Sequence, residues 1–207
     1  NKLAKKLNKE WNSPVNPKTD LAYLPFTTNE AHQYYDEMNY CVDFALANRK
    51  LILTRVQEVF RYYFPNITFG EIINIAHNYA TWENHFGKDV VVHRKGATSA
   101  HKGELGIIPG SQGTNSYIVE GLGNPESFAS CSHGAGRKMG RNEAIRTLSL
   151  EEEQRKLDRL GVVHAIKRQR DLDEAPSAYK NIVQVMADQE DLVKIVVKLW
   201  PLAVVKG

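Results

Sequence analysis

The sequence predicts an α+β fold, and three observations carry that prediction. Apolar residues recur at helical spacing in the N-terminal third of the chain. Short segments with alternating apolar residues follow, separated by glycine-bearing turns. Further helical patterns precede a β-rich C-terminal segment, so strands and helices do not alternate strictly. We therefore expect a mixed, largely antiparallel β-sheet with helices packed on it.

Composition excludes several classes of protein. The chain has 207 residues, 27 Lys and Arg against 24 Asp and Glu, and 42% apolar residues, which suits a folded domain rather than a disordered chain. It has no run of about 18 apolar residues, so we expect no membrane partner. Cys41 and Cys131 form no disulfide framework and fit a reducing cytoplasm.

A net charge of +3 permits a nucleic-acid partner without proving one. Because Asn1 stands first, we expect a processed product or a piece of a longer protein.

The N-terminal 66 residues are predicted to be a helical segment. Leu3 to Trp11 form a short helix, and the loop that follows carries three prolines. From about Asn29 to Tyr63 the apolar spacing predicts one long helix, which Pro65 ends. A break near Asn48 is left open.

Residues 67–207 are predicted to form the α+β region. Thr68 and Glu71 have capping-box spacing, but the alternation from Ile73 to Tyr79 and the turn at Phe86–Asp89 favour a β-hairpin. The remaining elements follow from the same patterns. They are strands at 105–108 and 116–119, a helix from the end of the 132–136 loop to about 147, a capped helix at 149–160, a strand at 162–166, a helix at 180–187 and a strand or strand pair at 193–205.

Glycine is concentrated in one window, and that window carries the candidate chemistry. Eleven of the 14 glycines lie between Gly87 and Gly140, in loops that also hold Ser, His, Arg and Lys. Glycine lets backbone N–H groups approach a ligand, and the polar side chains add hydroxyl donors and positive charge. The segments 92–98, 107–113 and 130–137 therefore predict a phosphate-binding assembly. Ordinary glycine-rich turns are the alternative, and no Walker motif is present.

His133 is the candidate nucleophile or general base of this window. Small residues flank it, and Arg137 is expected one helical turn later, where it could hold an anion. A helix that starts after Gly136 would oppose protonation of the imidazole. A histidine that only hydrogen-bonds its loop is the alternative. His77, His85 and His93 recur every eight residues, which suggests at most a partial metal site or polar positions on a half-exposed sheet.

Five motifs together resemble the RtcB family of RNA ligases. They are His77-Asn78-Tyr79-Ala80, His93-Arg94-Lys95-Gly96-Ala97-Thr98, Pro109-Gly110-Ser111-Gln112-Gly113, Ser116-Tyr117-Ile118-Val119 and Ser132-His133-Gly134-Ala135-Gly136-Arg137. The segments 175–181 and 205–207 extend the resemblance over essentially the whole chain. The chain is similar to the C-terminal half of such an enzyme. The Asp, Cys, His and Glu motifs of the family's N-terminal half do not occur in it. The resemblance implies an RtcB-like α+β body, of which this chain is one half.

The resemblance also implies an activity and a set of roles. Family members join RNA ends that carry a 2′,3′-cyclic phosphate or 3′-phosphate to RNA with a 5′-hydroxyl, and they use GTP and Mn²⁺. His133 would carry GMP, His77 would bind manganese, Tyr179 would stack on guanine and Lys206 would bind its edge. The expected nucleotide-binding residues are Asn78, Pro109, Gly110, Ser111, Ser116, Gly134, Ala135 and Gly136. The expected RNA or phosphate contacts are Arg94, Lys95, Arg137 and Arg141.

The partners implied are RNA, as transfer-RNA halves or other cleaved RNA, and an N-terminal half with the other metal ligands. Gln112 stands where the family commonly has Met, and Gly140 where Ser is common. Two other functions compete with RNA ligation: a non-catalytic module that binds nucleotide or RNA, and a metal-dependent phosphohydrolase. We expect little GMP to become attached to His133 in the 207-residue chain alone, because a single metal ligand cannot hold Mn²⁺.

Overall fold

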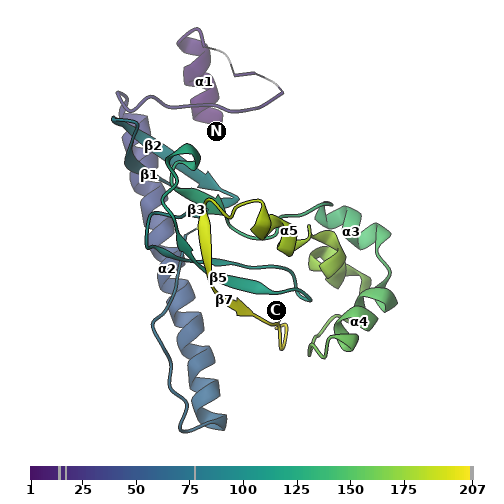
Figure 1. Ribbon diagram of the computed structural model, residues 1–207. Helices are drawn as coiled ribbons and strands as arrows, with labels where there is room; N and C mark the ends of the chain where they lie inside the picture. Colours follow the sequence, from purple (N-terminus) through teal and green to yellow (C-terminus); the bar gives the residue numbers. More distant parts are fainter. Residues whose placement is uncertain (14, 17, 77, 206–207) are drawn as a thin grey trace. The chain divides into compact units, whose positions relative to one another are not determined.

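The computed structural model describes residues 1–13, 15–16, 18–76 and 78–205, and its architecture is α+β (Figure 1). The chain divides into two compact units, residues 1–59 and 60–207. The sequence-based boundary lay after residue 66, several residues later than this division. In the described part of the chain, no helix has both the length and the apolar character needed to span a membrane.

The first unit is helical, as predicted. Helix α1 spans Lys2–Glu10 and helix α2 spans Asn29–Tyr63, so α2 continues into the second unit without a break near Asn48. In the first half of α2 the predicted apolar positions Tyr35, Met38, Val42, Ala45 and Leu46 form a half-buried face. The predicted apolar positions of the second half, Ile52, Val56, Val59, Phe60 and Tyr63, are exposed. The loop after α1 is fixed by buried Asn8, whose amide donates to Tyr23 O at 2.7 Å and accepts from Tyr23 N at 3.0 Å.

The first two strands of the second unit form the predicted hairpin. Strands β1 (Asn78–His85) and β2 (Lys88–Lys95) pair antiparallel around a two-residue turn. Phe86 and Gly87 both have positive φ, 52° and 74°, as this kind of tight hairpin turn requires. The first strand starts later than the sequence suggested. Ile73 and Ile75 lie before the strand, outside any regular element.

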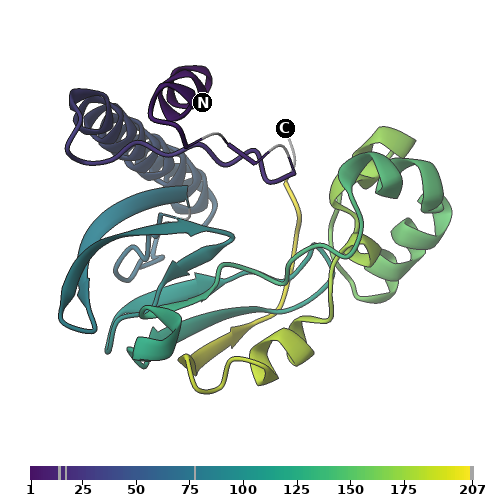
Figure 2. The same cartoon turned by 90° about the horizontal axis from the view of Figure 1, so that it is seen from above.

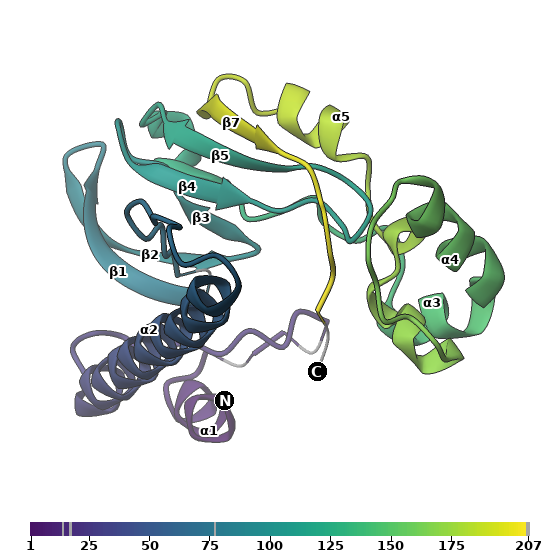
Figure 3. The same cartoon turned by 90° about the horizontal axis from the view of Figure 1, so that it is seen from below.

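The core of the second unit lies between a three-stranded antiparallel sheet and a short helix. The sheet order is β4 (Leu105–Ile108), β5 (Ser116–Gly121) and β7 (Val193–Leu199), and helix α5 (Ile182–Ala187) runs beside it (Figure 3). Strands β3 (Ala97–Ser99) and β6 (Ser130–Ser132) form a separate pair. The side chains buried together include Ile108, Tyr117, Val119, Cys131, Ile182, Met186 and Val193. Ala135, in the loop after β6, is buried in the same core.

A smaller helical part of the same unit lies beyond α5 (Figure 2). It contains α3 (Arg141–Thr147), α4 (Leu150–Arg159) and the 3₁₀ helices η2 (Gln169–Glu174) and η3 (Pro176–Ala178); a third 3₁₀ helix, η1 (Pro125–Ser127), precedes β6. Its apolar core is formed by Leu157, Val162, Ile166, Leu172 and Ala175. Ser149 caps α4, as predicted, by accepting from Glu152 N.

Of two predicted elements in this part, the first is present with its predicted end at Thr147 but starts late, and the second is not formed. The helix expected after Gly136 begins only at Arg141. The strand expected at 162–166 is not formed, although Val162 and Ile166 are both buried in the helical core. Only Val163 pairs, in one parallel bridge with Ala203 of the C-terminal segment.

Candidate functional site

Three glycine-bearing loops meet around His133. The first follows β2 at Gly96, the second joins β4 to β5, and the third follows β6. His133 N donates to Gly96 O at 3.4 Å, and Ala135 N donates to Pro109 O at 2.9 Å. A Cβ atom on Gly134 would lie 3.2 Å from Pro109 O. The sequence predicted that these loops form one assembly, and the backbone contacts bring them together.

The loop between β4 and β5 folds tightly on itself. A Cβ atom on Gly110 would lie 2.2 Å from Asn115 O, so only glycine fits this close approach. Gly110 N donates to Ser116 Oγ at 3.4 Å, and Ser111 N donates to Thr114 Oγ1 at 2.6 Å. Pro109, Gly110, Ser111 and Ser116 therefore occupy one compact turn beside the His133 loop.

The His133 loop is held from behind by α5. Ser132 N donates at 2.9 Å to the side-chain oxygen of Gln189, a buried residue just after that helix. Gly134 and Ala135 are buried, while His133 is half-buried. The predicted helix dipole does not act here, because α3 begins eight residues after His133 and such an effect fades within one turn. Gly136, with φ of 71°, turns the backbone away from a helix instead.

Arg137 and Tyr179 are neighbours across a short bridge. They pair antiparallel, and Lys180 N donates to Gly136 O at 2.9 Å. The Arg137 guanidinium carbon lies 5.0 Å from the centre of the Tyr179 ring, and Arg137 Nη1 donates to Tyr179 Oη at 3.2 Å. Arg137 is therefore not one helical turn from His133, as the sequence suggested, but it lies just after the His133 loop and against Tyr179.

Asn78 and Lys95 lie at the open end of the hairpin. They are register partners, both are exposed, and Gly96 follows directly and accepts from His133 N. The hairpin thus brings both predicted residues to the His133 loop. The predictions for His77 and Lys206 fall on residues outside the described part of the chain.

Arg94 is placed differently from the other predicted cations. Its side chain is 1% exposed and forms a two-point ion pair with Glu83, with one of the two contacts, Nη2 to Oε2, at 2.9 Å. Arg94 Nε also donates to Ser130 Oγ at 3.0 Å, and Nη2 donates to Phe128 O at 3.0 Å. These contacts join the hairpin to the segment before β6. They use the guanidinium inside the protein rather than at the loops around His133.

Glu83 gives this part of the protein a defined pH dependence. Burial raises the pKa of Glu83, but hydrogen bonds from Arg94 and His85 outweigh it and lower that pKa from 4.5 to about 2. A carboxyl whose pKa is lower in the folded state stabilises the fold above the unfolded pKa of 4.5, and this stabilisation is lost as the pH falls through about 2. Between about pH 6 and about pH 3, we expect this group to remove roughly 2 kcal/mol from the free energy of unfolding.

Urea unfolding at the two pH values measures that loss. The Glu83→Gln variant, although less stable at both, should show a smaller difference between them because it lacks the titrating carboxyl. Equal pH dependence in the two proteins would contradict the assignment to Glu83.

Sequence reasoning missed Glu174. It is the last residue of η2, and its carboxylate accepts from Arg137 Nη1 at 3.0 Å, from Arg141 Nε at 2.8 Å and from the Tyr179 hydroxyl. The hydrogen bond between Arg141 and Glu174 raises the pKa of the Arg141 guanidinium. An acidic residue is not an obvious member of an anion-binding site. Only its position five residues before Tyr179 could have indicated it.

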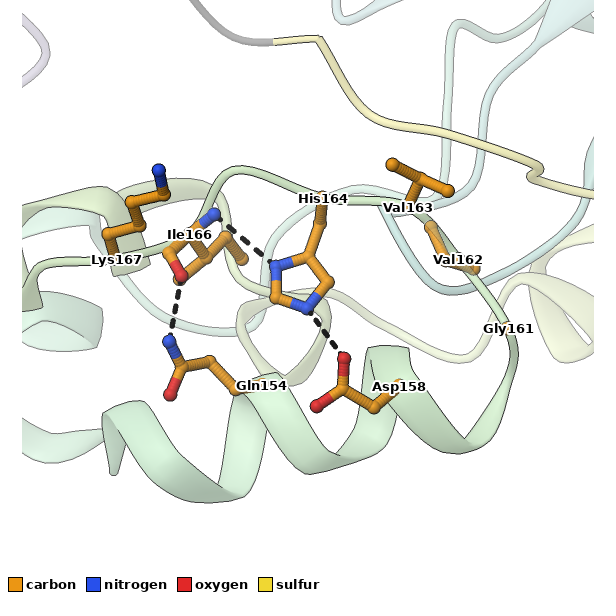
Figure 4. Close-up of a pocket in the computed structure, with 8 residues that line it drawn as sticks. All are labelled: Gln154, Asp158, Gly161, Val162, Val163, His164, Ile166 and Lys167. Carbon is orange, nitrogen blue, oxygen red and sulfur yellow. Dashed lines mark hydrogen bonds and ion pairs between the residues drawn. The ribbon is translucent and has the colours of Figure 1, made fainter.

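A hollow of about 610 Å³ lies elsewhere, beside α4 in the helical part (Figure 4). His164 points into it, with Nε2 3.2 Å from Asp158 Oδ1 and Nδ1 accepting from Ile166 N at 3.3 Å. Both ring nitrogens are thus used within the protein, so this histidine has neither one available for a substrate. The hollow is therefore a weaker candidate for catalysis than the His133 loops.

Among the described residues, no three His, Cys, Asp or Glu side chains are grouped as ligands of a metal ion. The described part of the chain does not by itself supply the donor set that Mn²⁺ needs. We therefore assign no step of the chemistry to a metal on these residues.

Comparisons with known proteins agree on one family. A family model described as "tRNA-splicing ligase RtcB" matches residues 1–207. The chain is 42% identical over 199 residues to the "RNA-splicing ligase RtcB" of Escherichia coli K12, covering 92% of this chain and 48% of that protein. It is 37% identical over 219 residues to the "tRNA-splicing ligase RtcB" of Nanoarchaeum equitans, covering 92% and 46%.

A third relative, the "tRNA-splicing ligase RtcB" of Thermococcus kodakarensis, is 34% identical over 233 residues, which cover 100% of this chain and 48% of that protein. The chain spans about half the length of these relatives. The matching profile, these identities and the glycine loops around His133 lead to the same conclusion: the chain belongs to the RtcB family.

Proposed function

We propose that this chain is the guanylate-carrying part of an RNA ligase. The ligase would join an RNA 3′-phosphate, or a 2′,3′-cyclic phosphate once water has opened the ring, to an RNA 5′-hydroxyl, with GTP as the second substrate. The observation that carries this proposal is the meeting of three glycine-bearing loops at His133. We infer that the partners are RNA, either transfer-RNA halves or other cleaved RNA, and the half of the relatives that this chain does not match. Two free cysteines support action in the cytoplasm.

The chemistry that we assign to His133 is phosphoryl transfer. A ring nitrogen attacks the α-phosphorus of GTP, an N–P bond forms, and the bond to pyrophosphate breaks. An oxygen of the RNA 3′-phosphate then attacks the guanylate phosphorus and releases His133. Finally the 5′-hydroxyl attacks the activated RNA phosphate, and GMP leaves. The protein's part in such transfers is mainly positioning and neutralisation of charge. Small residues around His133 and the exposed Lys95 fit those two tasks.

Two buried amide oxygens support a ligand at the loop between β4 and β5. Gln112 Oε1 and Asn115 Oδ1 are buried and have no hydrogen-bond partner among the described residues. A buried polar atom without a partner costs about 1–3 kcal/mol. The ribose hydroxyls and ring N–H groups of a guanosine nucleotide would donate hydrogen bonds to these oxygens once the loop opens around the ligand. Gln112 is thus a proposed nucleotide contact where the family commonly has methionine.

Manganese enters the proposal only through the resemblance. His77 would be one ligand, and the others would come from the half of the relatives that this chain does not match. A bound Mn²⁺ would polarise the phosphate under attack and stabilise its developing charge. The labelling experiment that tests the proposed function is therefore done with Mn²⁺ present.

A labelling experiment tests the proposed function. The chain is incubated with Mn²⁺ and GTP labelled at the α-phosphate, with and without the N-terminal half of the Escherichia coli relative. We expect acid-labile label on this chain with that half present, and little or none with this chain alone. Saturable GTP binding without label would favour the binding module, and release of inorganic phosphate without label would favour the phosphohydrolase. Strong labelling of the chain alone would contradict the need for a second half.

A further inference from the structure

Glu174 connects three residues of the candidate site through its two carboxylate oxygens. Oε2 accepts from Arg137 Nη1 at 3.0 Å and from the Tyr179 hydroxyl, while Oε1 accepts from Arg141 Nε at 2.8 Å. The Glu174 side chain is 26% exposed. It therefore joins the segment after His133, the start of α3 and the aromatic ring expected to stack on guanine.

The two arginines are held very differently. Arg137 is 24% exposed, and besides Glu174 it contacts the backbone oxygens of Asp173 and Met139, the latter at 3.1 Å from Nε. Its guanidinium also lies over the Tyr179 ring. Arg141 is the first residue of α3, is 69% exposed, and reaches Glu174 through Nε. A guanidinium carries five N–H donors, so most of the Arg141 fork faces solvent. Arg137 is thus fixed by several contacts, while Arg141 is held by an exposed ion pair of a kind that contributes little to stability.

We propose that Glu174 is a positioning residue with two tasks. It fixes Arg137 and Tyr179 as one unit, and it holds Arg141 until a phosphate of the RNA takes its place as the partner of Arg141. The inference rests on the proposed function for the identity of the ligand. A terminal RNA phosphate offers Arg141 two oxygens and more negative charge than Glu174 does, so it can replace the carboxylate as the partner of an exposed arginine. The RNA phosphate cannot draw Arg137 away from Glu174 in this way, because Arg137 stays bound to the backbone oxygens of Asp173 and Met139. One carboxylate then serves both as a permanent support and as a temporary partner.

Binding measurements on Glu174→Gln test this proposal. Glutamine keeps the shape of the side chain but removes the charge that holds Arg137 Nη1 and the Tyr179 hydroxyl together, while Arg137 Nε stays on Met139 O. We expect the affinity for GTP to fall about tenfold. The affinity for a single-stranded RNA that ends in a 3′-phosphate should instead rise about threefold at low salt, because Arg141 is released. A merely structural role would lower both affinities together, and that result would overturn the proposal.

Two controls separate Arg141 from the general loss of a negative charge. Glu151→Gln removes the same charge from an exposed position on α4 and should change neither affinity by more than about twofold. In the Glu174→Gln background, Arg141→Ala should abolish the gain for RNA. A gain that persists without Arg141 would assign the effect to charge alone and overturn the proposal.

An NMR measurement of the full chain tests the two classes of arginine without any ligand. In the unmodified protein, hydrogen exchange at Nε should be slow for both arginines, because each Nε–H has a partner. In Glu174→Gln, exchange at Arg141 Nε should rise about tenfold, while Arg137 Nε, which donates to Met139 O, should stay slow. Equal changes at the two positions would overturn the proposal even in a protein that binds GTP. The predicted difference in a protein that takes no acid-labile label even with the second half and Mn²⁺ present would leave the positioning role standing and refute the proposed function.

Discussion

Replacing His133 with alanine should reduce acid-labile labelling by GTP to background when Mn²⁺ and the second half are supplied. The imidazole nitrogen is the atom that forms the proposed N–P bond, and alanine offers no nucleophile in its place. The neighbouring loops hold the backbone of residue 133 through Gly96 O, and this contact does not depend on the side chain. GTP binding should therefore persist at an affinity within a few fold of the unmodified protein. Labelling and equilibrium binding, measured on the same preparation, distinguish loss of chemistry from loss of the site.

The matched control for this prediction is His93→Ala. His93 is also a histidine of the second unit, but it is exposed on β2 and its Nδ1 lies 3.1 Å from Val91 O of its own strand. We expect labelling of His93→Ala to remain within about twofold of the unmodified protein. Undiminished label on His133→Ala would show that another residue is the nucleophile. Its loss in both variants would point to a general defect of folding.

Features that depend on local chemistry could be predicted from the sequence. The Phe86–Gly87 turn, the Ser149 cap and the half-buried face of α2 each follow from residues a few positions apart, and the structure has all three. The meeting of the glycine loops was also predicted in outline from their shared composition, although the loops follow strands of three different sheets. The family resemblance then assigned chemistry to these loops that spacing alone could not.

The errors arise where contacts across long stretches of the chain decide the local structure. The segment after Gly136 reads as a helix, but Arg137 pairs with Tyr179, 42 residues away, and the backbone stays irregular until Arg141. Arg94 reads as a surface cation in a basic strand, but Ser130, 36 residues away, and Glu83 enclose it. A short window of sequence contains neither partner. For the same reason Glu174 could not be recognised as the residue that joins the two arginines.

Arg94→Met should lower the free energy of unfolding by about 3–5 kcal/mol, because it leaves the buried Glu83 carboxylate without its arginine, with His85 and His101 as its remaining neighbours. Methionine has similar length and replaces the apolar stem, so the loss reports mainly on charge and hydrogen bonds. The side chains of the pair are 1% and 10% exposed, which is why the cost should far exceed that of a surface pair. Urea unfolding at about pH 7 measures it. Adding Glu83→Gln to Arg94→Met should recover much of the loss, since no unpaired charge then remains.

Arg55→Met is the matched control, because Arg55 pairs with Glu58 on α2 with side chains 70% and 50% exposed. It should cost less than about 0.5 kcal/mol. If Arg94→Met costs no more than this control, the buried ion pair is not what joins the hairpin to the segment before β6. If it leaves stability unchanged and lowers the affinity for RNA, Arg94 contacts phosphate, as the resemblance implied. A large loss of stability, recovered by the double substitution, assigns Arg94 instead to the support that holds the hairpin, and with it Asn78 and Lys95, beside His133.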